Sequence, residues 1–274
     1  MGVPPMLTAP DFGDAPHGRD ARATGHRLLR SIVPVFLIVL MIPFARSLAA
    51  PTSQPATAPA DPALWAKLTD IDQRAGKVKT LSADFRQDKF TALLSKPLLS
   101  RGTVRINGST MRWDTQQPDQ NAMVIDPHEA KIYYPAQKTL EVYPLDRRLG
   151  ELAASPLPRL DVLRSRFSFE QIPAADLAKS ATTDGFIALK LVPIDPSLRE
   201  HVEQVRVLLD VRNAYIVRAE ITDSDGDRTV LSFDHVRLNV DVGDVSLKVP
   251  AGTTVTHPLE GLDGAPQSSR MKSK

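Results

Sequence analysis

Few side chains of this 274-residue sequence have the types and spacing that catalysis or metal binding requires. Cysteine is absent, which excludes a disulfide framework, a thiol nucleophile and a cysteine zinc site. The six histidines are scattered, and none is followed within four residues by a second histidine. The nucleophile elbow G-x-S-x-G, the P-loop, the dinucleotide motif G-x-G-x-x-G and H-E-x-x-H are also missing. The sequence therefore predicts no catalytic centre, no metal site and no cofactor.

Two groups of carboxylates are the remaining candidates. The three aspartates of Asp223–Asp227 flank Gly226 as in a calcium loop, but the glycine stands at loop position four instead of six and glutamate is missing at position twelve. A hairpin turn explains this segment better. Asp114 and Asp119 could form an acid–base pair, although charges at solvated strand ends explain them equally well. We therefore expect a binding protein and not an enzyme.

Composition and charge describe a globular protein without a strong electrostatic field. Hydrophobic residues make up 42% of the chain, a globular level that excludes wholesale disorder. The 34 basic residues are nearly balanced by 32 acidic ones. This balance gives no reason to expect nucleic acid as a partner.

The N-terminal part has the order of a secretory signal. Arginines are spread over residues 19–30, the 13 residues from Ile32 to Phe44 are all apolar or proline, and Ser47-Leu48-Ala49 provides small residues for cleavage. The apolar run is shorter than the span of about 20 residues that crosses a bilayer. We predict a signal peptide over residues 1–49, with an unusually long polar leader, and a periplasmic protein. An uncleaved N-terminal anchor is the alternative.

The rest of the chain divides into a tether, a folded domain and a tail. Residues 50–61 are rich in proline and alanine and are expected to be an extended tether. Residues 259–274 are polar and without pattern, and we expect a disordered tail. One folded domain is predicted over residues 62–258. It opens with a helix that starts at Pro62 and ends near Gly76, because its apolar residues recur at helical spacing.

After this helix the hydrophobic period changes from 3.6 to 2 residues, which indicates strands. Turn signals such as Asn107-Gly108 and Asp225-Gly226 separate the alternating runs. The phase slips near Asp234-His235, which predicts a β-bulge, and Val245–Val249 is expected to be the last strand. The fold class is mainly β (α+β). About ten or eleven hairpin-connected strands would form an unclosed, strongly curled antiparallel barrel.

One face of such a sheet encloses an apolar interior. Alternation places the following residues on that face, as the predicted cavity lining: Phe85, Val104, Met111, Trp113, Met123, Ile125, Ile132, Tyr134, Leu140, Val142, Val207, Leu209, Val217 and Ile221.

One stretch, Asp146–Arg166, lacks this alternation. It is expected to form two short helices divided by Pro156-Leu157-Pro158, with Leu149 and Leu152 on the first. Leu160, Leu163 and Phe167 lie at helical spacing on the second. Two interpretations stay open, namely a fixed plug that completes the core and a movable lid over the open side of the sheet.

The central segments resemble the LolA family, the periplasmic carriers of outer-membrane lipoproteins. The resemblance covers about residues 64–256 and is densest in 81–144. It is carried by the order and spacing of five segments: Leu81–Gln87, with its Phe-x-Gln; Gly102–Ile106; Met111–Asp114 followed by Gln117-Pro118-Asp119; Met123–Asp126; and Lys131–Pro135.

This resemblance implies an unclosed barrel with a helical lid and a cavity for acyl chains. The implied cargo is a lipoprotein or another acylated lipid. The implied partners are an inner-membrane lipoprotein-releasing transporter and an outer-membrane acceptor, and we expect a monomer. One departure concerns the family's basic residue followed by proline before the Trp segment. Asn107-Gly108 stands there, and neither Arg105 nor Arg112 matches.

Two other functions therefore stay open. A related protein could carry or sense free lipid or glycolipid. An envelope scaffold, from a different class, would use the sheet as a partner surface.

Overall fold

The structure is a computed structural model that describes residues 62–145, 155–178 and 183–259. The predicted signal peptide, the tether and the tail beyond Leu259 lie outside these residues. No helix within the described ranges is long and apolar enough to cross a membrane.

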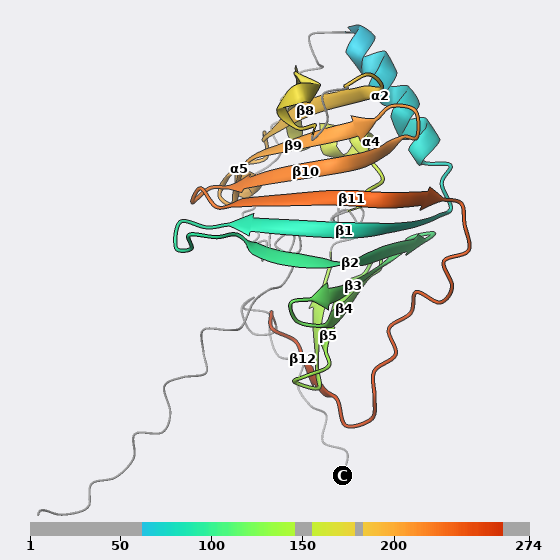
Figure 1. The fold of residues 1–274 in the computed structure, drawn as a ribbon, viewed down its shortest axis with the longest axis vertical. Coiled ribbons are helices and arrows are strands. Elements are labelled where there is room, and N and C mark those ends of the chain that lie inside the picture. Colours follow the sequence, from blue (N-terminus) through green and yellow to red (C-terminus); the bar gives the residue numbers. More distant parts are fainter. Residues whose placement is uncertain (1–61, 146–154, 179–182, 260–274) are drawn as a thin grey trace, which may run out of the picture. The chain divides into compact units, whose positions relative to one another are not determined.

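The described chain is mostly β, with few helices. Twelve strands form one sheet in the order β12-β6-β5-β4-β3-β2-β1-β11-β10-β9-β8-β7 (Figure 1). Their bounds are β1 Thr80–Phe90, β2 Leu98–Asn107, β3 Thr110–Gln117, β4 Asn121–Ile125, β5 Glu129–Tyr134, β6 Thr139–Pro144, β7 Phe167–Ile172, β8 Phe186–Pro193, β9 Val202–Asp210, β10 Tyr215–Asp223, β11 Arg228–Leu238 and β12 Thr254–Thr256.

Pairing within the sheet is antiparallel except between β12 and β6, which run parallel. The described edge strands β12 and β7 are not paired with each other, so the sheet is unclosed. The predicted fold class is confirmed, with twelve strands in place of ten or eleven.

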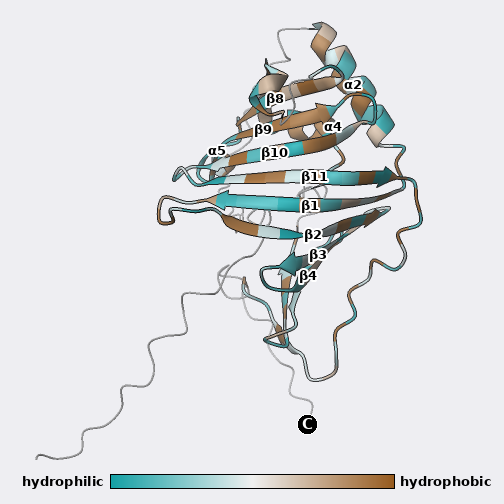
Figure 2. Ribbon diagram, in the orientation of Figure 1, coloured by the Kyte–Doolittle hydropathy of each residue, from teal (hydrophilic) through white to brown (hydrophobic). Residues whose placement is uncertain are grey.

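Helices occupy a small part of the described chain. They are α2 Pro62–Ala75, α4 Leu160–Arg164, α5 Pro196–Arg199 and the 3₁₀ turn η1 Ala174–Asp176. α2 is the predicted N-terminal helix, and its stripe of Leu64, Leu68 and Ile71 is buried. It lies at the β8–β10 end of the sheet (Figure 1). Hydrophobic and hydrophilic residues alternate along α2, as its amphipathic pattern requires (Figure 2).

The predicted bulge is present in β11. The register between β1 and β11 shifts between Ser82 and Asp84, whose partners are Arg237 and Asp234. His235 lies in this interval with φ of +51°. Such a conformation is uncommon for a residue with a Cβ, and it absorbs the extra residue of the bulge.

Two secondary-structure assignments from the sequence are wrong, one to a strand and one to a helix. Val245–Val249 does not form a strand; the chain there belongs to an extended segment, residues 239–253, that we call the strap. It runs from the end of β11 to β12 (Figure 1). Phe167, assigned to a helix, is the first residue of β7. The neighbouring β8 escaped the alternation analysis because Ile187, Ala188 and Leu189 are all buried, which removes the period of two.

Candidate functional site

The face of the sheet on which α2 and α4 pack, called here the inner face, carries two apolar clusters. The sheet cluster comprises the buried residues Leu81, Ala83, Phe85, Val104, Ile106, Met111, Trp113, Met123, Ile125, Ala130, Ile132, Leu157, Leu231 and Phe233. The helix-covered cluster joins α2, α4 and α5 to β7–β10 through Leu64, Leu68, Ile71, Ala75, Leu160, Phe167, Ile187, Leu189, Leu191, Leu198, Val207, Leu209, Ala214 and Ala219.

These two clusters lie side by side on one face but are covered differently. Leu231 of the sheet cluster is directly opposite Ala219 of the helix-covered cluster. Within the described ranges, no residue of a helix belongs to the sheet cluster. Its members from outside the strands are Val78, Leu145 and Leu157. The inner face therefore has one half packed by helices and one half to which the described helices contribute nothing.

Most of the predicted lining residues lie on the inner face. Eight of them meet in the sheet cluster, with Tyr134 partly buried at its border: Phe85, Val104, Met111, Trp113, Met123, Ile125, Ile132 and Tyr134. Val207 and Leu209 lie instead in the helix-covered cluster. Ile221 is buried opposite Val205 and Thr229, on the same face.

Three predicted lining residues lie on the opposite, outer face of the sheet. Leu140 and Val142 are directly opposite Tyr133 and Lys131, whereas the inner-face Ile132 is opposite Glu141. The short β6 has apolar residues on both faces, which misleads an alternation argument. Val217 packs with Leu208 and Ala188 on the outer face. The physical reason is the register shift in β10 between Ile216 and Arg218, which reverses the alternation at Val217.

The described part of the predicted lid is packed onto the sheet. Leu160 and Leu163 of α4 contact the helix-covered cluster. The backbone N–H of Leu160 donates to Oδ1 of Asp72 in α2 at 2.8 Å. The N–H of Ile216 donates to the carbonyl of Pro156 at 2.6 Å. These bonds hold residues 155–164 against α2 and β10, whereas the predicted lid residues Leu149 and Leu152 lie outside the described residues.

Trp113 is the centre of the sheet cluster. Its ring lies 4.7 Å from that of Phe85 and 5.9 Å from that of Phe233, in tilted, edge-on arrangements. Gly102 lies on β2, between β1 and β3. A Cβ at this position would approach Phe85 Cε1 to 2.8 Å and the carbonyl oxygen of Asp114 to 2.0 Å. Glycine is therefore required for this close approach. Met111 and Met123 add long, adaptable side chains to the same surface.

Sequence reasoning missed a set of buried polar residues on the same face. Gln87 is directly opposite Ser100, and Thr115 is directly opposite Asn121. Thr229 lies on β11, two residues from Leu231, and all five side chains are buried. The signal was available, because the alternation that places Phe85 inside places Gln87 there too. We call Gln87, Ser100, Thr115, Asn121 and Thr229 the inner polar patch.

The rim of the inner face at β6 carries a second polar group. Tyr143 Oη donates to Glu141 Oε2 at 2.8 Å, and both residues share the face of Ile132. Burial raises the pKa of Tyr134 and of Tyr143 well above the usual range, and the neighbouring Glu141 carboxylate adds to both shifts. Both phenols are therefore neutral donors over the whole physiological range.

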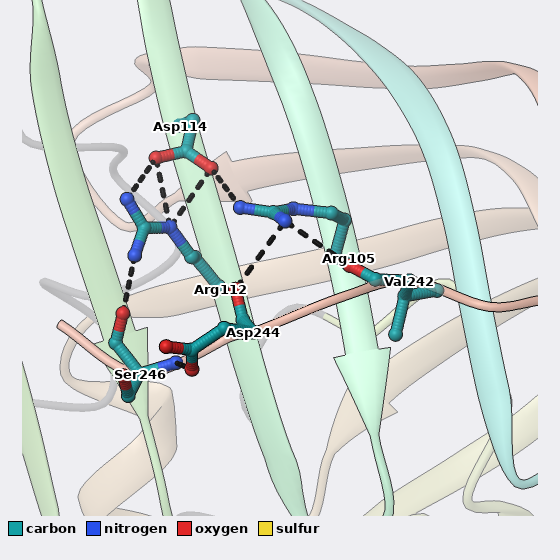
Figure 3. A network of polar contacts seen from close by, with 6 residues as sticks. All are labelled: Arg105, Arg112, Asp114, Val242, Asp244 and Ser246. Carbon is teal, nitrogen blue, oxygen red and sulfur yellow. Dashed lines mark hydrogen bonds and ion pairs between the residues drawn. The ribbon is translucent and has the colours of Figure 1, made fainter.

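An ion-pair network fixes the strap to the outer face (Figure 3). Asp114 accepts hydrogen bonds from Arg105 at 3.0 Å and from Arg112 at 2.9 Å. Arg105 also donates to the carbonyl of Val242 at 3.1 Å, and Arg112 donates to that of Ser246. Burial raises the pKa of Asp114, but bonding and charge from the two arginines outweigh it and lower the pKa below the usual value. Asp114 is thus a structural anion.

The other carboxylate candidate is a hairpin turn, as expected. Asp223–Asp227 connects β10 to β11, and Gly226 has φ of +89°. In the described residues, no group of three or more His, Asp or Glu side chains is placed to hold a metal ion. Burial is the main cause that raises the pKa of Asp223, to about 6.

The fold and site together define a particular architecture, an unclosed, curled sheet whose inner face is apolar. The family model of the outer membrane lipoprotein carrier protein LolA matches residues 76–248, which is more than half of the chain. This chain therefore belongs to the LolA family.

Solved structures resemble the chain at low sequence identity. An uncharacterized conserved protein from Thermus thermophilus is 13% identical with a TM-score of 0.44, over 71% of this chain and 99% of that one. Lipoprotein LppX from Mycobacterium tuberculosis is 15% identical with a TM-score of 0.40, over 68% and 100%. A LolA superfamily protein from Nitrosomonas europaea is 13% identical with a TM-score of 0.33, over 65% and 95%. Among curated proteins, no sequence matches the chain significantly.

Proposed function

We propose that this protein is a periplasmic carrier that binds the acyl chains of lipoproteins on the sheet cluster and transfers them from the inner to the outer membrane. The observation that carries the proposal is the uneven cover of the inner face. Helices α2 and α4 pack one half, whereas no described helix contributes a residue to the half around Trp113. Membership of a family described as outer membrane lipoprotein carriers supports the same function.

The energetics suit a carrier that must also release its cargo. Burying one methylene stabilises a complex by about 0.8 kcal/mol, so a long acyl chain gains roughly ten kcal/mol before costs. Ordering the chain and the protein removes part of this gain. Met111 and Met123 let the surface adapt to chains of different shape, because thioether side chains have several accessible rotamers.

This function places the protein in the periplasm, as a monomer that meets a lipoprotein-releasing transporter at one membrane and an acceptor at the other. It is a binding role and not an enzymatic one.

Processing is the first check on the location. We expect the protein in envelope fractions to begin near Ala50, which N-terminal sequencing decides. A full-length species in washed membranes would show an anchor instead.

A carrier of free lipid or glycolipid is the second candidate, because Asn107-Gly108 replaces the basic residue and proline that LolA carriers have before the Trp segment. In this chain Gly108 has φ of +60° and serves the tight turn between β2 and β3. Arg105 and Arg112 are committed to the strap on the outer face.

Mass spectrometry of ligands that co-purify with the protein from its native envelope separates the candidates. Acylated peptides are expected for the lipoprotein carrier, and phospholipid or glycolipid would favour the second function. Purification without acylated ligand, together with failure to bind any acyl probe, would refute both carrier functions and favour an envelope scaffold.

A further inference from the structure

The inner polar patch lies at a defined position beside the sheet cluster. Gln87 follows Phe85 on the inner face, and its cross-strand neighbour is Ser100. Thr115 is opposite Gly102 on one side and Asn121 on the other. The patch therefore borders the Phe85–Trp113 surface on the side toward the turn between β1 and β2. Directly opposite side chains on a sheet are close neighbours, so these groups can act together.

Several polar atoms of this region are buried without a partner. Among the described residues, Ser100 Oγ, Asn121 Oδ1, Thr229 Oγ1 and Trp113 Nε1 have no hydrogen-bond partner, although their residues are at most 7% exposed. The Asn121 amide nitrogen donates to the carbonyl of Asp119 at 3.5 Å. A buried polar group without a partner costs free energy, and native proteins leave few of them. Four such atoms beside one apolar surface indicate a ligand that completes their bonding.

The chemistry of the patch is that of an uncharged ligand group. Hydroxyl and indole groups can donate, and Asn121 Oδ1 can accept. None of the five patch residues is ionisable. Lys89, on the same face opposite Thr229, is 3.7 Å from Asp227 and is paired with it. A free carboxylate or phosphate would find no unpaired cation among these groups.

We propose that the inner polar patch binds the acyl linkages of the cargo, uncharged esters or amides whose carbonyls accept separately from hydroxyls of the patch such as those of Ser100 and Thr229. Asn121 Oδ1 accepts from an adjacent hydroxyl or amide N–H. The acyl chain then extends over the sheet cluster from this fixed point, so the cargo binds in one orientation. This inference rests on the proposed function, since it specifies the ligand of the same face.

The test compares two ligands that differ only in the linkage. Affinities of the purified protein for 1-lauroylglycerol, an ester, and 1-O-dodecylglycerol, its ether, are measured by displacement of a fluorescent acyl probe. We expect the ester to bind about fivefold more tightly, the effect of one or two net hydrogen bonds. Equal affinities would overturn the inference and leave the proposed function standing. If neither ligand binds, the inference and the proposed function are both refuted.

Matched variants locate the effect. The double variant Ser100→Ala with Thr229→Val removes two unpaired hydroxyls and nearly preserves shape, so it should melt no lower than the parent protein. It should lose most of the ester preference. The control, Ser82→Ala with Thr103→Val, removes the same groups from the outer faces of β1 and β2 and should keep the preference. Retention of the full preference in the first variant would show that the hydroxyls bind ordered water only and would overturn the assignment.

A third arm identifies the source of the linkage. A lipopeptide with a diacylglyceryl cysteine and a diacylglycerol of equal chain length are each compared with their ether analogues. An ester preference is expected in both pairs. Tighter binding of the lipopeptide identifies a lipoprotein as the source, and tighter binding of the diacylglycerol identifies a free glycerolipid. Absence of an ester preference in both pairs contradicts the inference.

Discussion

Replacing Met111 by glutamine tests whether the sheet cluster is a binding surface or an ordinary packed core. Met111 lies opposite Ile106 and Ile125 in the sheet cluster and is 6% exposed. Leu189 of β8 is a matched control, because it is fully buried on the same face but lies in the helix-covered cluster. Glutamine resembles both side chains in length, so the two variants differ mainly in their surroundings.

The proposed function predicts different costs for these variants. At Leu189 the change loses about 2 kcal/mol of apolar burial and leaves an amide unpaired inside the helix-covered cluster at about 1–3 kcal/mol. For a domain of this size, 1 kcal/mol corresponds to roughly 2–4 °C, so Leu189→Gln should lower Tm by about 8 °C or more. If the sheet cluster is a binding surface, water enters it in the ligand-free protein and hydrates the amide at position 111, so the loss should stay near 1 kcal/mol, or about 2–4 °C.

Ligand affinity should change in the opposite sense. An acyl chain that enters the sheet cluster must displace the water from the new amide, which costs about 1–2 kcal/mol and weakens binding roughly tenfold. Leu189→Gln should leave affinity nearly unchanged in the fraction that folds. The assay is fluorescence titration with an acyl probe, with calorimetry on the same samples. The reasoning is refuted if Met111→Gln loses as much stability as Leu189→Gln and keeps wild-type affinity.

Three further predictions concern the framework. Asp114→Asn should lower Tm by a few degrees at pH 7, and the deficit should shrink progressively as the pH falls below about 4, because a lowered pKa gives stability above about pH 4 that is lost as the carboxylate protonates; a deficit that does not shrink argues against the network. Asp223→Asn should raise Tm more at pH 7.5 than near pH 3, because a folded-state pKa of about 6 against an ordinary value of 3.8 makes the carboxylate increasingly destabilising as the pH rises from about 4 to 6; a gain at pH 7.5 no larger than that near pH 3 contradicts this. Gly102→Ala should lower Tm by roughly 6 °C or more because its Cβ overlaps backbone, and a loss below about 2 °C would show that the strands can separate there.

The sequence predicts the fold well where one face of a strand is buried and the other is solvated. Alternation in β3 places Met111 and Trp113 together because Arg112 and Asp114 point the other way. It fails where both faces are covered. β8 has consecutive buried residues, and β6 has Leu140 and Val142 on the outer face near the strap. The strap is a long-range feature, held by Arg105 and Arg112, and no local pattern predicts it.

Only part of the candidate site follows from the sequence, because alternation does not show what covers the inner face. Eight apolar residues of the sheet cluster follow from periodicity, but their separation from the helix-covered cluster depends on where α2 and α4 pack. Val217 was misplaced because a bulge shifts the register in β10, and bulges leave a weak trace in sequence. The inner polar patch was missed because polar residues on strands are ordinarily assigned to solvent.

Photo-crosslinking of a bound acyl chain tests the central claim most directly. The protein is loaded with a fatty-acyl ligand that carries a diazirine near the chain end, irradiated and mapped by mass spectrometry. We predict labels on inner-face residues of the sheet cluster, with Met111, Trp113 and Met123 among them, and loss of these labels under competition by unlabelled acyl ligand. Labels confined to the outer face around Leu140 and Val142, or no competable label at all, would contradict the account.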